Sequence, residues 1–222
     1  MSDKSSALHR YFVTGTDTDV GKTRVAAALA LALKNHGITP VIVKLVQTGL
    51  APGIPGDAAR AGKLAGARWL ELVRFEKAAD PWSAALSSGQ PEVRASELVE
   101  AVAHIGEGLV TEGAGGLMVP LNAREHFGNI AVAGQFRTVL TVGLKLGCVN
   151  HALLTAMQCQ QAGITLIGAV LVERWGPTEQ SYREDVARTL QGKVKILGIL
   201  PFDEDEAASV KAGAHVFDSL FA

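Results

Sequence analysis

The sequence predicts a doubly wound α/β fold, with a mostly parallel sheet and helices on both of its faces. Apolar segments typical of strands alternate with helical segments along the chain. Continuous Val/Ile runs, such as residues 40–46 and 166–172, are typical of parallel strands that are buried on both faces. With 222 residues and 48% hydrophobic residues, the chain suits a single α/β domain spanning 1–222, with residues 1–9 as a flexible tail.

The first half of the chain contains three predicted strands. A short strand at 12–13 precedes an Ala/Leu-rich helix at 25–34, which Gly37 would terminate. A second strand at 40–46 leads through a Pro/Gly-rich loop to an Ala-rich helix that begins at Asp57. Residues 75–91 are expected to be irregular, 96–105 to form an amphipathic helix, and 108–111 a third strand.

The second half continues the alternation. Strands are expected at 138–142, 166–172 and 194–200, and helices are expected up to about residue 162, at 180–191 and from about residue 210. No repeat and no low-complexity segment interrupts this pattern.

The segment from Gly15 to Thr23, Gly-Thr-Asp-Thr-Asp-Val-Gly-Lys-Thr, joins the first strand to the first helix. This layout indicates a phosphate-binding P-loop, in which backbone N–H groups and the positive helix end surround a polyphosphate. Lys22 would reach the β- and γ-phosphates, and the Thr23 hydroxyl would bind Mg²⁺. The strict pattern requires glycine where Thr16 stands, so the loop departs from it.

Three charged residues are candidates for a site: two lie where a strand gives way to a loop, and one begins a helix. Lys44, near the end of the second strand, either extends from an edge strand to solvent or belongs to a site at the strand ends, and the nearby P-loop favours a site. Asp57 is either a helix N-cap or a ligand. Glu112, followed by Gly-Ala-Gly-Gly, is either a solvated turn carboxylate or a Walker-B-like residue that binds Mg²⁺.

Composition argues against several functional classes. The net charge is −1 and no basic block is present, so a nucleic-acid-binding surface is not expected. No apolar run predicts a membrane span, and the N-terminus does not resemble a signal peptide. Cys148 and Cys159 lack metal-ligand spacing and are interpreted as reduced core thiols of a cytoplasmic protein.

Together these segments resemble the dethiobiotin synthetase family of P-loop proteins. The resemblance includes the loop from Gly15 to Thr23, Lys44 with the Val-Gln-Thr-Gly segment 46–49, and Asp57. It continues with Glu112-Gly-Ala-Gly-Gly, Val119-Pro120, and Gly-Leu-Lys-Leu-Gly-Cys-Val-Asn-His at 143–151. It covers the chain from residue 11 to residue 201.

The resemblance implies a ligase of biotin biosynthesis that uses ATP and Mg²⁺. One amine of 7,8-diaminopelargonic acid captures CO₂ as a carbamate, the carbamate attacks the γ-phosphate, and the second amine closes the cyclic urea. The enzyme would be a homodimer with the substrate near the subunit interface, and no nucleic acid or membrane would be a partner.

The resemblance also implies roles for individual residues. Lys44 and Lys22 would be catalytic, and the metal ligands would be Thr23, Asp57 and Glu112. The implied nucleotide-binding residues are Asp19, Val20, Gly21, Lys22, Thr23, Arg24, Asp57, Glu112, Gly113, Ala114, Gly115, Glu173, Arg174, Pro201, Phe202 and Asp203. The implied substrate-binding residues are Thr18, Lys44 and Thr48, together with Gly147, Cys148, Val149, Asn150 and Tyr182 from the partner subunit.

Two positions depart from the family pattern. Leu45 stands where proline usually follows the active-site lysine, which is expected to change local rigidity but not the chemistry. Glu173 stands where an asparagine usually reads adenine, and an ionised carboxylate accepts hydrogen bonds but donates none. The nucleotide preference is therefore open, and Phe202 is either a neighbour of the base or an ordinary core residue.

Two other functions remain as alternatives. An amide-forming synthetase of the cobyrinate type would require an attached glutamine-hydrolysing domain, for which 222 residues leave no room. A switch ATPase resembling ParA or MinD usually carries an extra lysine early in the loop, where this chain has Asp17. Partner-stimulated ATP hydrolysis that does not depend on a diamine would favour this second alternative.

Overall fold

The computed structural model describes residues 9–106 and 108–221. A seven-stranded sheet in the order β3-β2-β4-β1-β5-β6-β7 forms the centre of the molecule, and every pairing between neighbouring strands is parallel. The strands are β1 (Arg10–Gly15), β2 (Pro40–Thr48), β3 (Arg68–Phe75), β4 (Gly108–Gly116), β5 (Arg137–Gly143), β6 (Leu166–Val172) and β7 (Ile196–Leu200). The predicted doubly wound α/β class is confirmed.

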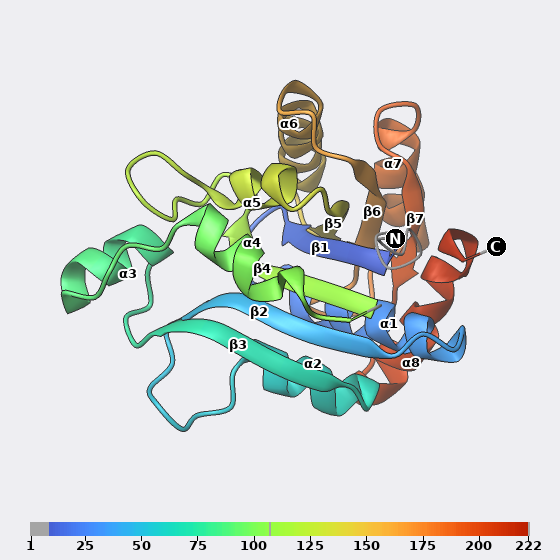
Figure 1. The fold of residues 1–222 in the computed structure, drawn as a ribbon. Helices are drawn as coiled ribbons and strands as arrows, with labels where there is room; N and C mark the ends of the chain where they lie inside the picture. Colours follow the sequence, from blue (N-terminus) through green and yellow to red (C-terminus); the bar gives the residue numbers. More distant parts are fainter. Residues whose placement is uncertain (1–8, 107, 222) are drawn as a thin grey trace, which may run out of the picture.

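Helices cover both faces of the sheet (Figure 1). One face packs against α1 (Lys22–Asn35), α2 (Asp57–Ala65), α8 (Glu206–Ala214) and the 3₁₀ helix η2 (His215–Leu220). The other face packs against α3 (Pro81–Ser88), α4 (Ala95–Ala103), α5 (Phe127–Ala133), α6 (Cys148–Gln161) and α7 (Gln180–Leu190).

Alternating residues of the central strand β1 divide the core into two layers. Tyr11 and Val13 point to the face of α1, whereas Phe12 points to the face of α5 and contacts Phe127 with ring centroids 6.4 Å apart. All three are fully buried. Burial on both faces is the physical reason for the continuous apolar runs in the sequence.

The sequence interpretation missed one strand and two helices and placed the start of the last helix wrongly. Residues 68–75 form a strand, β3, in addition to the six strands that the sequence predicted. The helix α3 lies inside the segment 75–91, which was expected to be irregular. The α5 helix was also missed, and the last helix begins at Glu206 and not near residue 210. Residues 1–8, most of the predicted tail, lie outside the described residues, and His9 contacts Phe221 with ring centroids 5.9 Å apart.

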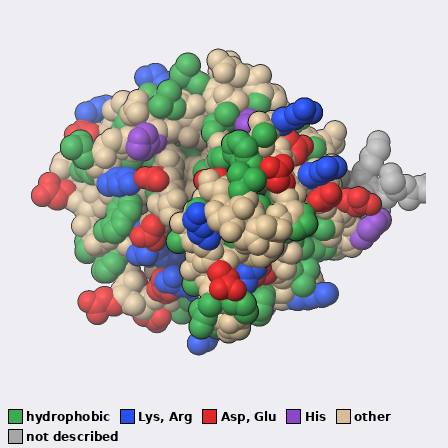
Figure 2. All heavy atoms as spheres, turned by 90° about the vertical axis from the view of Figure 1, so that its left-hand side faces the viewer, with side chains coloured by type: hydrophobic (Ala, Val, Ile, Leu, Met, Phe, Trp, Pro, Cys, Tyr) green, Lys and Arg blue, Asp and Glu red, His purple; other side chains and the backbone are tan. Residues whose placement is uncertain are grey.

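Because all strands are parallel, their carboxyl ends meet at one edge of the sheet, where ligands bind in open α/β folds. Figure 2 faces this side of the molecule and shows acidic and basic side chains interspersed, without a large patch of one sign. No helix of the described residues is long and apolar enough to cross a membrane.

Candidate active site

The P-loop joins the end of β1 to the start of α1. Gly21 is the N-cap of α1 with φ 99°, and no side chain caps the helix, so its first N–H groups remain available to an anion. A β-carbon at Gly21 would lie 2.8 Å from Val172 Cγ1, so glycine is required both by φ and by space. The Lys22 ammonium donates to the Asp17 carbonyl at 2.8 Å, which holds the lysine along the loop.

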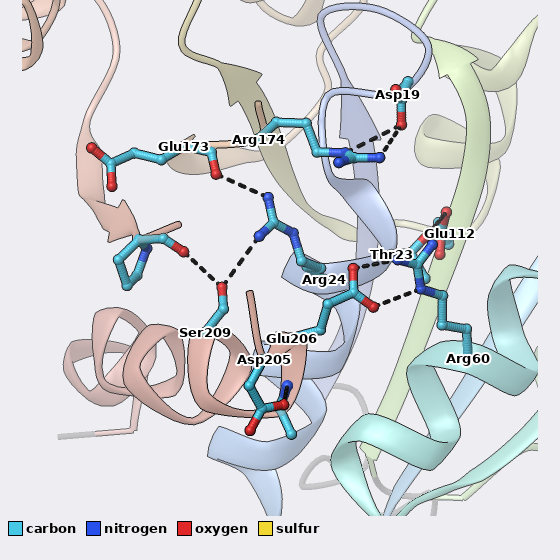
Figure 3. Close-up of polar contacts among 12 residues, drawn as sticks. Asp19, Thr23, Arg24, Arg60, Glu112, Glu173, Arg174, Asp205, Glu206 and Ser209 are labelled. Atoms are coloured by element: carbon cyan, nitrogen blue, oxygen red, sulfur yellow. Dashed lines mark hydrogen bonds and ion pairs between the residues drawn. The ribbon is translucent and has the colours of Figure 1, made fainter. Parts of the chain in front are cut away.

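Asp19 is the strained residue of the loop, with φ 57° in the left-handed region. Its carboxylate accepts hydrogen bonds from Arg174 Nη2 at 2.8 Å and Nε at 3.2 Å (Figure 3). Arg174 follows β6, so a loop far away in the sequence holds this unusual backbone conformation. The predicted residue Val20 is fully buried.

Lys44 lies inside the sheet, between two carboxylates. Its ammonium is 2.6 Å from Asp57 Oδ2 and 2.8 Å from Glu112 Oε1, and it also donates to the Gly113 carbonyl at 3.0 Å. The register of β2 and β4 pairs Lys44 directly with Glu112, which places both side chains on one face. Since β2 lies between β3 and β4 and Lys44 is 2% exposed, Lys44 belongs to a site and does not extend from an edge strand to solvent.

Asp57 is the first residue of α2 and does not cap it, because the N-cap is Gly56. Its backbone N–H donates to Gln47 Oε1 at 2.9 Å, and its carboxylate points to Lys44. A β-carbon at Gly56 would lie 2.6 Å from Glu71 Oε2 and 2.8 Å from Gln47 Oε1. The close packing around Gly56 thus fixes where α2 begins and where the Asp57 carboxylate lies.

The electrostatics of this cluster differ from those of exposed groups. Burial alone would lower the pKa of Lys44, but Glu112 and Asp57 outweigh burial and raise that pKa above its usual value. Burial raises the pKa of Glu112, with Lys44 opposing it. Burial and then the nearby Lys44 lower the pKa of Lys22 to about 8. A neighbouring polyanion would favour the charged form of Lys22.

Thr23, Asp57 and Glu112 supply oxygens of the kind that Mg²⁺ prefers. Thr23 Oγ1 is 3.1 Å from Glu112 Oε1, and Glu112 Oε2 is buried without a hydrogen-bond partner in the described residues. Two carboxylates and one hydroxyl make an incomplete octahedron, and the described residues contain no cluster of three His, Cys, Asp or Glu side chains suited to a metal. The residues fit an ion that takes its remaining ligands from phosphate and water.

A cavity of about 630 Å³ extends across these groups. At one end it is lined by Thr48 at the end of β2, by Gly115 near the end of β4, and by Ala78 and Asp80 in the segment after β3. At the other end it is lined by Arg24, Arg60, Arg174 and Glu206. The P-loop residues Thr18, Asp19, Gly21, Lys22 and Thr23, together with Lys44, Asp57, Glu112 and Ala114, also line it.

Figure 3 shows the end that lies near α8. Arg60 on α2 forms an ion pair with Glu206 on α8, with Nε 2.9 Å from Oε2. Arg24 donates to the Glu173 carbonyl at 3.1 Å and to Ser209 Oγ at 3.3 Å. These contacts connect α1, α2 and α8 with the loop after β6.

The Glu173 carboxylate is already used by the chain's own donors. It accepts from the N–H groups of Thr178 at 3.0 Å and Phe202 at 3.1 Å, and from Arg183 Nη1 at 2.8 Å. Burial raises its pKa, but these hydrogen bonds together lower it below the usual value. Glu173 therefore fastens the loops after β6 and β7 to each other.

Some of the predicted site residues do not line this cavity. Pro201, Phe202 and Asp203 follow β7 next to Glu173, whereas Gly147, Cys148, Val149 and Asn150 lie at the start of α6. Tyr182, on α7, lines a separate open cavity with Trp175, and its hydroxyl is 3.6 Å from Cys148 Sγ. The described chain brings Tyr182 and Cys148 together but does not bring either to Lys44.

The sequence interpretation missed four polar residues of the cavity: Gln47, Arg60, Asp80 and Glu206. Gln47 lay inside the quoted Gln-Thr-Gly segment, and Arg60 lies one helical turn after Asp57, so both had a local signal. Asp80 and Glu206 had none, because only tertiary packing brings their helices to the cavity.

A P-loop after β1 and an acidic residue on the neighbouring strand β4 define the chain as a P-loop nucleotide-binding protein. A sequence family described as an AAA domain matches residues 9–209. Among solved structures, the chain resembles the MinD cell division ATPase of Pyrococcus furiosus, with 18% identity, coverage of 95% and 99% of the two chains, and a TM-score of 0.59. A ParA family ATPase from Chlorobium tepidum TLS gives 14% identity, coverage of 96% and 92%, and a TM-score of 0.56. At these identities the likeness shows the fold alone.

Curated relatives narrow the class. An ATP-dependent dethiobiotin synthetase of Rhodococcus jostii (strain RHA1) is 38% identical and covers 94% of each chain. Another, from Anaeromyxobacter dehalogenans (strain 2CP-C), is 36% identical and covers 90% of this chain and 93% of the relative. The chain belongs to the ATP-dependent dethiobiotin synthetase family, as the sequence motifs indicated.

Proposed function

We propose that this protein carboxylates 7,8-diaminopelargonic acid with CO₂ and closes the ureido ring of dethiobiotin, converting ATP to ADP and phosphate. One observation carries the proposal: the Lys44 ammonium is buried between Asp57 and Glu112, beside a P-loop, in a cavity that continues past both. The cavity thus has space for a polyphosphate at one end and a second ligand at the other.

The chain's own residues contribute positioning and charge. Lys22 and the amides of the loop bind the outer phosphates, and Lys44 pairs with the carbamate and then with charge on the transferred phosphoryl group. Thr18 and Thr48 hold the amine or carbamate end of the substrate through hydrogen bonds. Phosphoryl transfer from ATP to the carbamate needs such positioning and does not need a protein nucleophile.

Mg²⁺ is part of the proposal. Thr23, Asp57 and Glu112 would hold the ion, which offsets the charge of the phosphates when it is bound. Glu112 Oε2, which is buried and has no hydrogen-bond partner among the described residues, supports this assignment, because such an oxygen otherwise costs stability.

The proposed enzyme is a homodimer of the cytoplasm in which Gly147 to Asn150 and Tyr182 serve the partner's substrate site. Exposed apolar side chains support an interface at α6, since Leu146 is 94%, Leu154 57% and Met157 56% exposed. The N–H groups at the start of α6 suit a substrate carboxylate. The two free, buried cysteines suit a reducing compartment.

Mixing the protein with the diamine, bicarbonate, Mg²⁺ and ATP tests the function, and mass spectrometry should detect the cyclic urea. ATP hydrolysis that a protein partner stimulates without any diamine would instead support the switch-ATPase alternative. No product with any of several nucleotides would refute the proposal.

Subunit complementation tests the shared site. Lys22→Met and Asn150→Ala should each be nearly inactive alone, because each removes one subunit's contribution. After the subunits are mixed and exchanged, about a quarter of the wild-type activity should return, since half of the dimers then contain one intact site. Recovery of no activity in mixed dimers would place Asn150 outside the shared site.

A further inference from the structure

The carboxylates that line the active-site cavity are paired with cations of the described residues, with one exception at the end away from α8. The cavity has five carboxylates, those of Asp19, Asp57, Asp80, Glu112 and Glu206. Asp19 pairs with Arg174, Asp57 and Glu112 share Lys44, and Glu206 pairs with Arg60. Among the described residues, Asp80 has no ion-pair partner.

Asp80 directly precedes α3, whose start lies beyond the carboxyl ends of β2 and β3 (Figure 1). Its Oδ1 accepts the Ser83 N–H at 2.9 Å and caps the helix, and all groups found to hydrogen-bond this carboxylate within the described chain are neutral groups of residues 80–83. Asp80 shares the cavity with Thr48 and Lys44. The carboxylate therefore holds the start of α3, and its charge faces the cavity without a cation of the described residues to balance it.

Unpaired cations lie elsewhere along the same cavity. Neither Lys22 nor Arg24 has a carboxylate partner in the described part of the chain, and both line the cavity from α1. Two ligands would match this distribution of charge: an anionic ligand at α1 and a ligand with a cationic group at the start of α3. The triphosphate is the anionic ligand, and a protonated amine would supply the cationic group.

We infer that Asp80 is a substrate-recognition residue that binds the second ammonium group of the diamine while the first nitrogen lies near Lys44. This inference rests on the proposed function and adds a residue that fixes the direction in which the substrate binds. An ammonium group is attracted to Asp80, whose charge no cation of the described residues balances, whereas a carbamate is repelled by Asp80 and can pair with Lys44. The two charges thus assign the two nitrogens to different ends of the pocket.

The protonation state of Asp80 agrees with a binding role. Partial burial raises its pKa, but hydrogen bonds from Ser83 and neighbouring backbone N–H groups lower it below the usual value. The carboxylate is therefore ionised at neutral pH and is a poor proton acceptor. Asp80 attracts the cation, and no bond is made or broken at its oxygen atoms.

The test separates the charge of Asp80 from its capping role. Asp80→Ser and Asp80→Asn keep a side-chain oxygen that can cap α3 but remove the charge. Each should raise the KM for 7,8-diaminopelargonic acid about tenfold or more, while the KM for ATP and the melting temperature stay close to those of the wild type. High salt should raise the diamine KM of the wild type more than that of Asp80→Ser, because the attraction is screened.

Asp205→Ser is the matched control. Asp205 caps α8 by accepting the Ala207 N–H at 2.9 Å, yet it does not line the cavity, so its loss should leave the diamine KM unchanged. A normal diamine KM in Asp80→Ser would overturn the inference and leave Asp80 as a helix cap. Failure of the wild type itself to make the cyclic urea would overturn the proposed function, so the two failures are distinguishable.

Discussion

Replacing Lys44 by methionine removes the only positively charged side chain that the described residues place between Asp57 and Glu112. Methionine keeps most of the side-chain volume, so the change tests charge and not packing. Glu112 is 1% exposed, and its second oxygen has no partner in the part of the chain that the structure describes, so water cannot readily replace the lost ammonium. Asp57, with 34% of its side chain exposed, is better able to regain water.

Breaking a buried ion pair by removing one partner costs about 3–5 kcal/mol. For a chain of this size each kcal/mol corresponds to roughly 2–4 °C, so the melting temperature should fall by about 6–20 °C. The loss should be largest at alkaline pH. Burial already raises the pKa of Glu112, and removing Lys44 raises it further, so Glu112 gains a proton as the pH falls and the loss shrinks.

Chemical denaturation at pH 8 and at pH 6 measures both effects. Lys145→Met is the control, because Lys145 forms an exposed pair with Asp17 at 2.9 Å that should contribute at most about 1 kcal/mol. The double variant Lys44→Met/Glu112→Gln should recover much of the stability, since it leaves no uncompensated charge at Glu112.

Turnover gives a second measurement. Lys44→Met should lower kcat by at least about a hundredfold and leave nucleotide binding mostly intact. A Lys44→Met variant as stable as Lys145→Met would refute the electrostatic reasoning. Near-normal turnover would show that the carbamate does not bind at Lys44.

Three further changes test other parts of the site. Gly56→Ala should destabilise the protein by about 1–3 kcal/mol and raise the Mg²⁺ concentration needed for half-maximal activity, because its β-carbon would crowd Glu71 Oε2 at 2.6 Å. Gly106→Ala, with open space around it, is the control, and an equal loss of stability in the two variants would contradict the crowding argument. Glu173→Gln should lose about 1–3 kcal/mol in denaturation, because its one amide oxygen can replace either Oε2, which accepts from Phe202, or Oε1, which accepts from Thr178 and Arg183, and the amide nitrogen cannot accept from the remaining donors; an unchanged stability would mean that these donors find water. His126 caps α5 through a neutral Nδ1 that accepts the Gly128 N–H, and burial lowers the pKa of His126 below 6.5. The stability that this cap contributes is therefore present above pH 6.5 and is lost as the pH falls below that value. Thermal melts of His126→Asn should show a weaker pH dependence of stability than the wild type, and an unchanged pH profile would argue against the role of His126.

Local sequence patterns were enough to predict the strands that are buried on both faces of the sheet. Residues 40–46 and 166–172 contain long Val/Ile runs, and both lie inside strands of the sheet. The edge strand β3 was missed because its segment, Arg-Trp-Leu-Glu-Leu-Val-Arg-Phe, mixes charged and apolar residues. Its pairing with β2, and not its composition, makes it a strand.

In the candidate site, too, some residues could be assigned from the sequence and others needed the tertiary structure. The Gly-Lys-Thr segment identified the P-loop because neighbouring residues form it. The choice between two roles for Lys44 and for Asp57 needed the register of β2 with β4 and the packing around Gly56. Asp80 and Glu206 reach the cavity only through the placement of α3 and α8.

The sequence by itself determined the α/β class, the phosphate-binding loop and the family, because each depends on short-range patterns that a chain carries in any conformation. The tertiary structure alone decided which charges meet: Lys44 pairs with Asp57 and Glu112, and Glu173 accepts hydrogen bonds from the protein's own donors. It also left Asp80 without an ion-pair partner among the described residues. The physical reason is that electrostatic energy depends on distance and burial, and the distance between residues far apart in sequence is set only when the sheet and its helices pack.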